Sequence, residues 1–140
     1  MFAVLDTNHF RVVAEGADAA DVLDQRARKQ EAEIFLSVIT VQEATGGWLG
    51  LINGMTAGRA QVRAYASFQK TIAAFGKFDI LPFDDDAAER FHALKKAFPN
   101  DGTMDLKIAA ICLAHDMTLL TRDTGDFKDI PGLRVENWLD

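Results

Sequence analysis

Four carboxylates stand where apolar segments of this 140-residue chain end or begin. They are Asp6 after residues 2–5, Glu43 after residues 34–38, Asp105 before residues 106–114, and Asp123 after residues 118–121, with Asp126 close behind it. In an open α/β sheet the carboxyl ends of the strands share one edge, so these acids could meet in one pocket. A divalent cation would relieve their mutual repulsion, because Mg2+ and Mn2+ prefer oxygen ligands. The spacing predicts a metal-dependent phosphodiester hydrolase.

The elements that would position these acids alternate between short apolar runs and helical stretches, which indicates an α/β fold with a mainly parallel sheet. Strands are expected at 2–5, 34–38, 80–83, 118–121 and 133–136. Helices are expected at 18–29, 41–51, 56–75, from a cap at Asp84 to just before Pro99, and at 104–115. An apolar stripe on the helix 56–75 is expected to belong to the core, with a dimer or partner surface as the alternative. The stripe comprises Val62, Tyr65, Phe68, Ile72 and Phe75.

Length and composition predict a single domain over residues 1–140, with 49% hydrophobic and 26% charged residues. No apolar run approaches the ~20 residues that span a bilayer, and no basic signal-peptide start is present, so no membrane role is expected. The single Cys112 lies in an apolar run, which favours a buried thiol and a cytoplasmic protein. The net charge of −6 counts against a polyanionic substrate. Cations bound among the acids would offset this, and fifteen Lys and Arg residues remain for phosphate contacts.

Each acid also has a purely structural interpretation. Asp6 could cap the following segment, in which Thr7 and Asn8 could bind free backbone groups or orient Asp6, and His9 could be a turn residue or face the pocket. Thr40 to Glu43 matches a capping box, in which Glu43 would reach back to the amide of the N-cap residue, Thr40. Asp105 could simply be an acid in the first turn of a helix with its N-cap at Thr103, where the helix dipole stabilises a negative charge. Asp126 could be an exposed loop charge, and the acids 84–86 read as a helix N-terminus.

The order of the motifs resembles a PIN-domain ribonuclease, and within that superfamily the VapC-type toxins of prokaryotic toxin–antitoxin pairs. The resemblance rests on five segments: Val4–Asn8, Ser37–Glu43, Thr103–Ala110, Leu119–Phe127 and Ile130–Trp138. It implies a PIN-like three-layer α/β/α sandwich, usually a homodimer, that cuts RNA with Mg2+ or Mn2+ and is blocked by an antitoxin protein. Asp6, Asp105 and Asp123 would hold metal, while Glu43 and Asp126 would hold metal or orient its waters.

One departure from the family leaves an alternative open. Many toxins of this type have Asn where Asp123 stands and keep an acid at the place of Asp126, so either residue could contact metal directly. Candidates for phosphate contact are Arg59, Arg63, Lys107 and Arg122. The rival function is a non-catalytic RNA-binding or scaffold domain of the same fold. A receiver-like phosphoacceptor domain is disfavoured, because no Lys follows the late strand 118–121.

Overall fold

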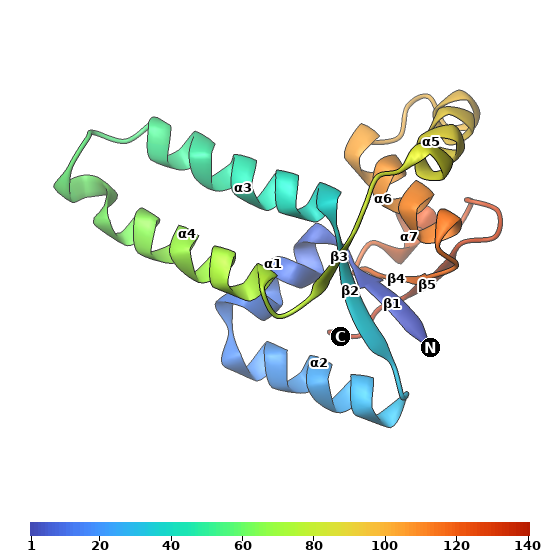
Figure 1. Cartoon of the computed structure of the whole chain (residues 1–140), viewed down its shortest axis with the longest axis horizontal. Helices are drawn as coiled ribbons and strands as arrows, with labels where there is room; N and C mark the ends of the chain where they lie inside the picture. Colours follow the sequence, from blue (N-terminus) through green and yellow to red (C-terminus); the bar gives the residue numbers. More distant parts are fainter.

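The computed structural model describes residues 1–140 as a parallel five-stranded sheet with helices on both faces (Figure 1). The strands are β1 (Phe2–Leu5), β2 (Glu33–Ser37), β3 (Asp79–Leu81), β4 (Thr118–Leu120) and β5 (Arg134–Glu136). The helices are α1 (Thr7–Glu15), α2 (Ala17–Lys29), α3 (Val38–Asn53), α4 (Val62–Phe75), α5 (Asp85–Ala97), α6 (Thr103–Ala114) and α7 (Thr124–Phe127), with a 3-10 turn, η1, at Arg59–Gln61. No helix has the length and apolar character needed to cross a bilayer.

The strand order is β3-β2-β1-β4-β5, and every pairing is parallel. In the register, Val4 of the central strand lies between Phe35 and Leu119. Parallel neighbours need crossover connections, which the helices supply, so all strands end on the same edge of the sheet. The predicted three-layer α/β/α sandwich is therefore confirmed. The single domain over 1–140 remains a prediction.

Alternation along the strands divides the core in two, because successive side chains point to opposite faces. Val4 and Leu119 pack with α6 and α7 in one cluster. Leu5, Leu36 and Leu120 pack with α1, α2 and the end of α4 in the other. Helix α6 is apolar on all sides, as the sequence predicted, and its residues 108–112 are fully or almost fully buried. It fixes Asp105 at the end of a rigid element.

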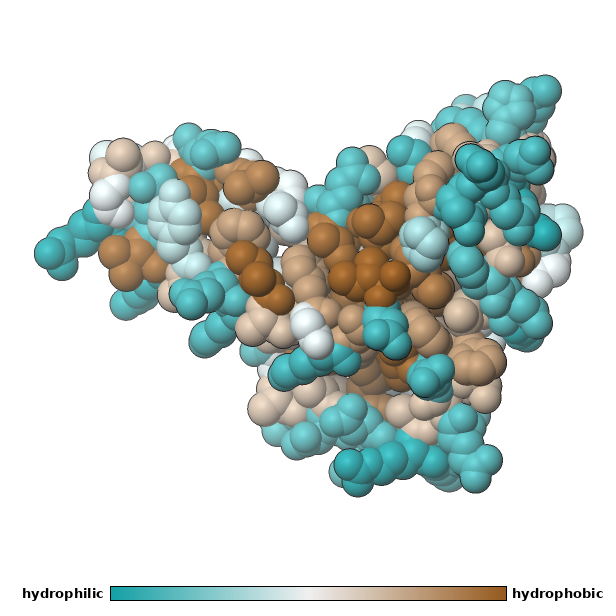
Figure 2. Space-filling model, in the orientation of Figure 1, coloured by the Kyte–Doolittle hydropathy of each residue, from teal (hydrophilic) through white to brown (hydrophobic).

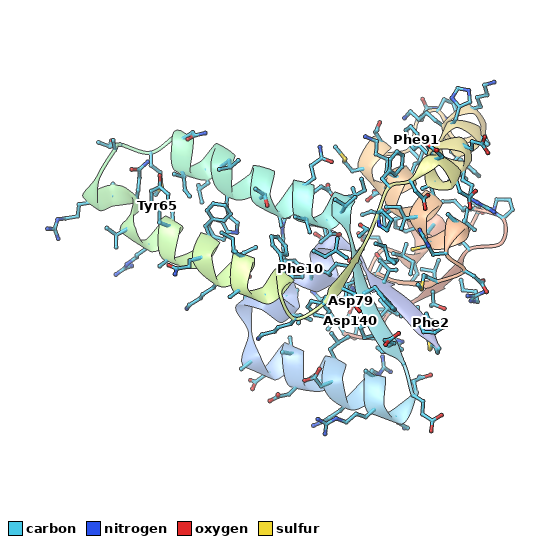
Figure 3. The ribbon with its side chains drawn as sticks, in the orientation of Figure 1. Phe2, Phe10, Tyr65, Asp79, Phe91 and Asp140 are labelled. Carbon is cyan, nitrogen blue, oxygen red and sulfur yellow. The ribbon has the colours of Figure 1, made fainter.

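Helices α3 and α4 form a long hairpin that projects from the sheet, with η1 at its far end (Figure 1). Figure 3 shows Tyr65 toward the far end of this hairpin and Phe10 where it meets the body. The core prediction for the apolar stripe of α4 is wrong at three positions: Val62, Tyr65 and Ile72 are 62%, 53% and 52% exposed. The buried side of α4 is instead built from Ala64, Thr71 and Ala74, which let the helix pack closely. The exposure of Val62, Tyr65 and Ile72 favours the alternative interpretation of the stripe, a dimer or partner surface.

Several predicted boundaries need correction. No helix was predicted for residues 7–15 or 124–127, which form α1 and α7. α2 begins at Ala17, one residue before the expected start, and its N-cap Gly16 makes no side-chain bond, so Asp18 lies in the first turn. β3 ends at Leu81, short of the expected end at residue 83, because the following Pro82 has no N–H to donate. The cap at Asp84 is confirmed, since its Oδ1 accepts from the Ala87 amide at 2.9 Å.

Candidate active site at the carboxyl edge of the sheet

The five predicted acids are brought together around the N-terminus of α6. The charges of Glu43, Asp6, Asp123 and Asp126, in that order of effect, reach Asp105. Together with partial desolvation by the surrounding protein, which is the largest cause, they raise the pKa of Asp105 above its ordinary value of 3.8. We call this group the acid edge: Asp6, Glu43, Asp105, Asp123 and Asp126. Like charges held this close destabilise the folded state, which is a cost typical of functional sites.

Asp6 is held by the start of α1. It is the N-cap of that helix, and its Oδ1 accepts a hydrogen bond from the His9 amide at 2.7 Å. The carboxylate is almost fully buried, and Oδ2 accepts no hydrogen bond from the protein. The capping and ligand interpretations of Asp6 are thus compatible, because one oxygen satisfies the helix while the other stays free. Asn8 is exposed and takes no part in this arrangement.

Glu43 is positioned by a hydroxyl pair and not by a capping box. Ser37 is the N-cap of α3, accepting from the Thr40 amide at 3.2 Å, so the predicted cap at Thr40 is wrong. The helix begins three residues earlier, which places Glu43 in its second turn. Its Oε1 accepts a hydrogen bond from Thr7 Oγ1 at 2.7 Å, and Thr7 lies 3.1 Å from Thr40 Oγ1. Thr7 therefore orients Glu43, whereas the sequence suggested that it would orient Asp6.

The remaining acids occupy the first turns of α6 and α7. Gly102, not Thr103, precedes α6, and a Cβ at Gly102 would lie 3.3 Å from Asp105 Oδ2. The glycine thus leaves room for that carboxylate. Asp123 is the N-cap of α7 but makes no side-chain cap bond, so its carboxylate is free. Asp126 lies in the single turn of α7, three residues after Asp123.

A polar cavity of about 410 Å³ opens beside Asp105 and Asp126, between the α5–α6 loop and α7. Asp101 and Asp129 also line it, and sequence reasoning did not find either of them. Neither residue follows a strand, which was the signal used. Yet Asp101 stands just before the helix start that carries Asp105, and this adjacency could have indicated it.

The acid edge contains only oxygen donors, which fit Mg2+ or Mn2+ in kind. However, no three His, Cys, Asp or Glu side chains are arranged to hold one ion in this structure. The raised pKa of Asp105 and the absence of a ready-made metal site are compatible, because the two depend on different distances between the carboxylates. Charges act on one another over several ångströms, whereas ligand bonds to Mg2+ are roughly 2 Å long. The acids share one neighbourhood without forming a coordination sphere.

The predicted phosphate-contacting residues are only partly near this edge. Arg122 adjoins Asp123 in sequence and pairs with Asp140, with Nε 3.3 Å from Oδ2. Lys107 Nζ lies 5.7 Å from the centre of the Phe91 ring, so its charge faces aromatic surface. Arg59 belongs to η1 at the far end of the hairpin, and Arg63 is the second residue of α4, which follows η1 directly. Cys112 is fully buried, and desolvation raises its pKa to about 12, so it is an unreactive core thiol.

A second concavity lies at the base of the hairpin. This hairpin groove has a volume of about 340 Å³ and is lined by α1, α3 and α4. Its lining residues are Phe10, Arg11, Ala14, Glu15, Ala44, Gly47, Trp48, Leu51 and Thr71. Phe10 stacks on Phe75 with ring centres 5.1 Å apart, and Trp48 Nε1 donates to Thr71 Oγ1 at 3.0 Å, which fixes the groove wall. Figure 2 shows hydrophobic residues gathered along the hairpin and at the centre of the face it displays.

Comparison with known proteins decides the family. The model of the PIN domain matches residues 3–133. The chain belongs to the PIN domain family. It is 32% identical to the plasmid stability protein StbB of Pseudomonas syringae pv. tomato over 138 residues, which cover 96% of each chain. It is also 32% identical to toxin FitB of Neisseria gonorrhoeae over 99 residues, or 68% of each chain.

Solved structures share the fold over the whole chain. The VapBC2 structure from Rickettsia felis, bound to a DNA fragment from its promoter, has a TM-score of 0.78 at 22% identity and covers 99% of both chains. Other solved structures with this fold are toxin–antitoxin complexes. The resemblance to VapC-type PIN proteins, predicted from five sequence segments, is confirmed.

Proposed function

We propose that this PIN-domain protein is a Mg2+- or Mn2+-dependent endoribonuclease and the toxin of a toxin–antitoxin pair. The observation that carries the proposal is the convergence of four carboxylates on Asp105, close enough that their charges add to desolvation in raising its pKa. A scaffold domain gains nothing from such repulsion. The similarity to FitB and to toxin–antitoxin complexes supports the toxin role.

The chain's own residues would divide the work as follows. Asp6 and Asp105 are the central ligands, and Asp123 or Asp126 completes the set. The free Oδ2 of Asp6 faces no competing donor from the protein. Glu43, whose carboxylate is fixed by Thr7, holds metal or orients a water for attack on phosphorus. The cation, when bound, would lower the pKa of its water and stabilise the charge that develops on the phosphate.

Binding a cation would require these side chains to draw together. Their mutual repulsion opposes this movement until the cation supplies the opposite charge. Since all donors are oxygens, Mg2+ and Mn2+ should support cleavage and Zn2+ should not replace them. No side chain is needed as nucleophile, in keeping with a site that has no Ser, His and Asp in triad geometry.

The test is RNA cleavage by the purified protein with and without metal. Activity should disappear in chelator and return with Mg2+ or Mn2+, and sequencing the cleaved ends would identify the RNA target. Undiminished cleavage after exhaustive chelation would refute the metal role. No cleavage under any condition, together with RNA binding, would favour the scaffold alternative.

We also propose that the antitoxin enters through the hairpin groove. Helices α1 and α3 both begin near the acid edge and line the groove further along, where Ala44 directly follows Glu43. A partner segment with an apolar anchor in the groove could therefore reach the acids with an Arg or Lys. Such a cation would compete with metal. Co-purification with the product of the neighbouring gene, followed by cleavage assays over a range of Mn2+, tests this. A partner that binds without slowing cleavage would exclude it.

The homodimer implied by the family also remains a proposal. The exposed Val62, Tyr65 and Ile72 on α4 offer apolar surface for it. Light scattering of the purified chain would give the oligomeric state directly, and a monomer at all concentrations would refute the dimer.

A further inference from the structure

His9 is a fully buried histidine with an unpartnered ring nitrogen beside the acid edge. It lies in the first turn of α1, and its side chain is 0% exposed. Its Nδ1 is buried without a hydrogen-bond partner in the structure. Oδ1 of Asp6 lies 3.5 Å from Nδ1. A polar group placed this deeply without a partner calls for a functional explanation.

The other ring nitrogen is held by the C-terminal segment. The backbone N–H of Trp138 donates to His9 Nε2 at 3.4 Å, and Trp138 is itself 2% exposed. The segment is anchored on both sides of this contact. Arg26 Nη1 donates to the carbonyl of Asn137 at 3.1 Å, and Arg122 pairs with Asp140. Because Nε2 accepts a hydrogen bond, the proton of the neutral imidazole must sit on Nδ1.

We propose that His9 is a positioning residue for Asp6. The Nδ1–H of His9 points toward Oδ1 of Asp6, and the His9 ring links the C-terminal segment to the acid edge. The proposal rests on the assignment of Asp6 as a metal ligand. Oδ1 is then held between the His9 amide at 2.7 Å and the ring N–H, so Oδ2 is left to bind. Hydrogen bonds in such sites are often long before the ligand binds and shorten afterwards. Groups that orient a metal ligand typically change affinity or activity by 10–100-fold when removed.

Two substitutions separate positioning from packing. In His9→Asn the amide nitrogen falls near the place of Nδ1, so the donor to Asp6 survives while the contact with Trp138 is lost. In His9→Gln the amide oxygen falls near the place of Nε2, so the contact with Trp138 survives while the donor is lost. His92→Gln, on the exposed face of α5, is the matched control.

The probe is Mn2+, titrated by calorimetry into each full-length variant, with melting temperatures measured in chelator. We expect His9→Gln to weaken Mn2+ binding by ~10–100-fold with the smaller change in melting temperature. His9→Asn should lower the melting temperature yet keep most of the Mn2+ affinity, and His92→Gln should change neither. If affinity and melting temperature fall together in both His9 variants, His9 has only a packing role and the proposal is overturned.

A second measurement needs no variant to fold and no activity. Nitrogen NMR of the wild-type protein labelled at its three histidines reports which ring nitrogen carries the proton. The expected result for His9 is the Nδ1–H tautomer, and the Nε2–H tautomer would overturn the proposal even if the variants misfold. If the wild type shows that tautomer but binds no Mn2+, the proposed function fails while the geometry at His9 stands. The two failures are therefore distinguishable.

Discussion

The acid edge and the hairpin groove lie next to each other and are built on opposite principles. The acid edge gathers five carboxylates at the ends of rigid elements, and desolvation together with their repulsion raises the pKa of Asp105. The groove gathers aromatic and aliphatic side chains with one cation, Arg11, and one anion, Glu15. The repulsion among the carboxylates of the acid edge does not help folding, so it indicates a chemical role for them. The exposed apolar surface of the hairpin groove indicates that it binds a partner.

The comparison also explains how one partner could control both regions. The helices α1 and α3 contribute to each, with Thr7 and Glu43 at the edge and Phe10 and Trp48 in the groove. A segment bound in the groove gains its affinity from apolar burial, while its charged end meets the acids. Binding and inhibition would then depend on different residues, which substitutions can separate.

The largest effect is expected from removing a central charge of the acid edge. Asp6→Asn and Asp105→Asn should each lower RNA cleavage by ~100-fold or more, because metal assistance is worth several kcal/mol and each 1.4 kcal/mol is tenfold. The control is Asp21→Asn on the exposed face of α2. Cleavage rates under saturating Mn2+ measure the effect. Full activity in both variants would show that the site has been misassigned.

The second-largest effect is expected from a substitution in the hairpin groove. Leu51 lines it, and Leu51→Asp should weaken antitoxin binding by ~30-fold or more, since buried apolar anchors typically contribute 2 kcal/mol or above. Val62→Asp, at an exposed apolar residue of the same hairpin outside the groove, should bind normally. Titration calorimetry with the purified antitoxin compares them. Equal loss in both variants would place the partner on the exposed stripe of α4 instead.

A smaller effect concerns the orientation of Glu43. Thr7→Val removes the hydroxyl that donates to Oε1 and should lower cleavage by ~10-fold, the lower end of the range for groups that orient a site residue. Thr7→Ser keeps the hydroxyl and should retain most of the activity. Steady-state rates with Mn2+ distinguish the two, and equal loss in both would mean that the methyl group matters through packing.

The strands and the acids were predictable from sequence because both follow a local rule. Apolar runs of four or five residues mark buried strands, and an acid just beyond each run marks the carboxyl edge, which located Asp6 and Asp123. Glu43 was located by the same rule, but its hydrogen-bond partner was not. The Thr7–Glu43 contact joins residues 36 positions apart, and only the packing of α1 against α3 creates it.

Other features could not be predicted because they depend on what a helix meets in three dimensions. The stripe from Val62 to Phe75 has the spacing of a core face, yet α4 buries Ala64, Thr71 and Ala74 and leaves Val62, Tyr65 and Ile72 exposed. The periodicity of apolar residues identifies one face of a helix but does not show which part of the protein, if any, packs against that face. The burial of His9 likewise depends on Trp138, which is 129 positions away and arrives at the end of the chain.

The smallest expected effect is a gain in stability. Burial and the four neighbouring charges raise the pKa of Asp105 in the folded chain, so its ionised form is disfavoured there relative to the unfolded chain. Because the folded pKa of Asp105 is raised, its contribution to the free energy of unfolding is fully present below the unfolded pKa of 3.8. This contribution is lost as the pH rises through the folded pKa. At neutral pH the charge of Asp105 therefore destabilises the fold.

Asp105→Asn should then melt higher than the wild type at pH 7 in chelator, by on the order of 1 °C, because solvent screens an exposed carboxylate. The difference should shrink as the pH falls and vanish below 3.8, where the wild-type carboxyl is protonated in both the folded and the unfolded chain. Asp21→Asn, away from the acid edge, should show no such pH-dependent gain. Saturating Mn2+ should reverse the order at pH 7, since only the wild-type cluster would gain stability from the cation. A variant that is less stable than the wild type at pH 7 without metal would mean that the Asp105 charge favours the helix dipole of α6 more than its four neighbours oppose it.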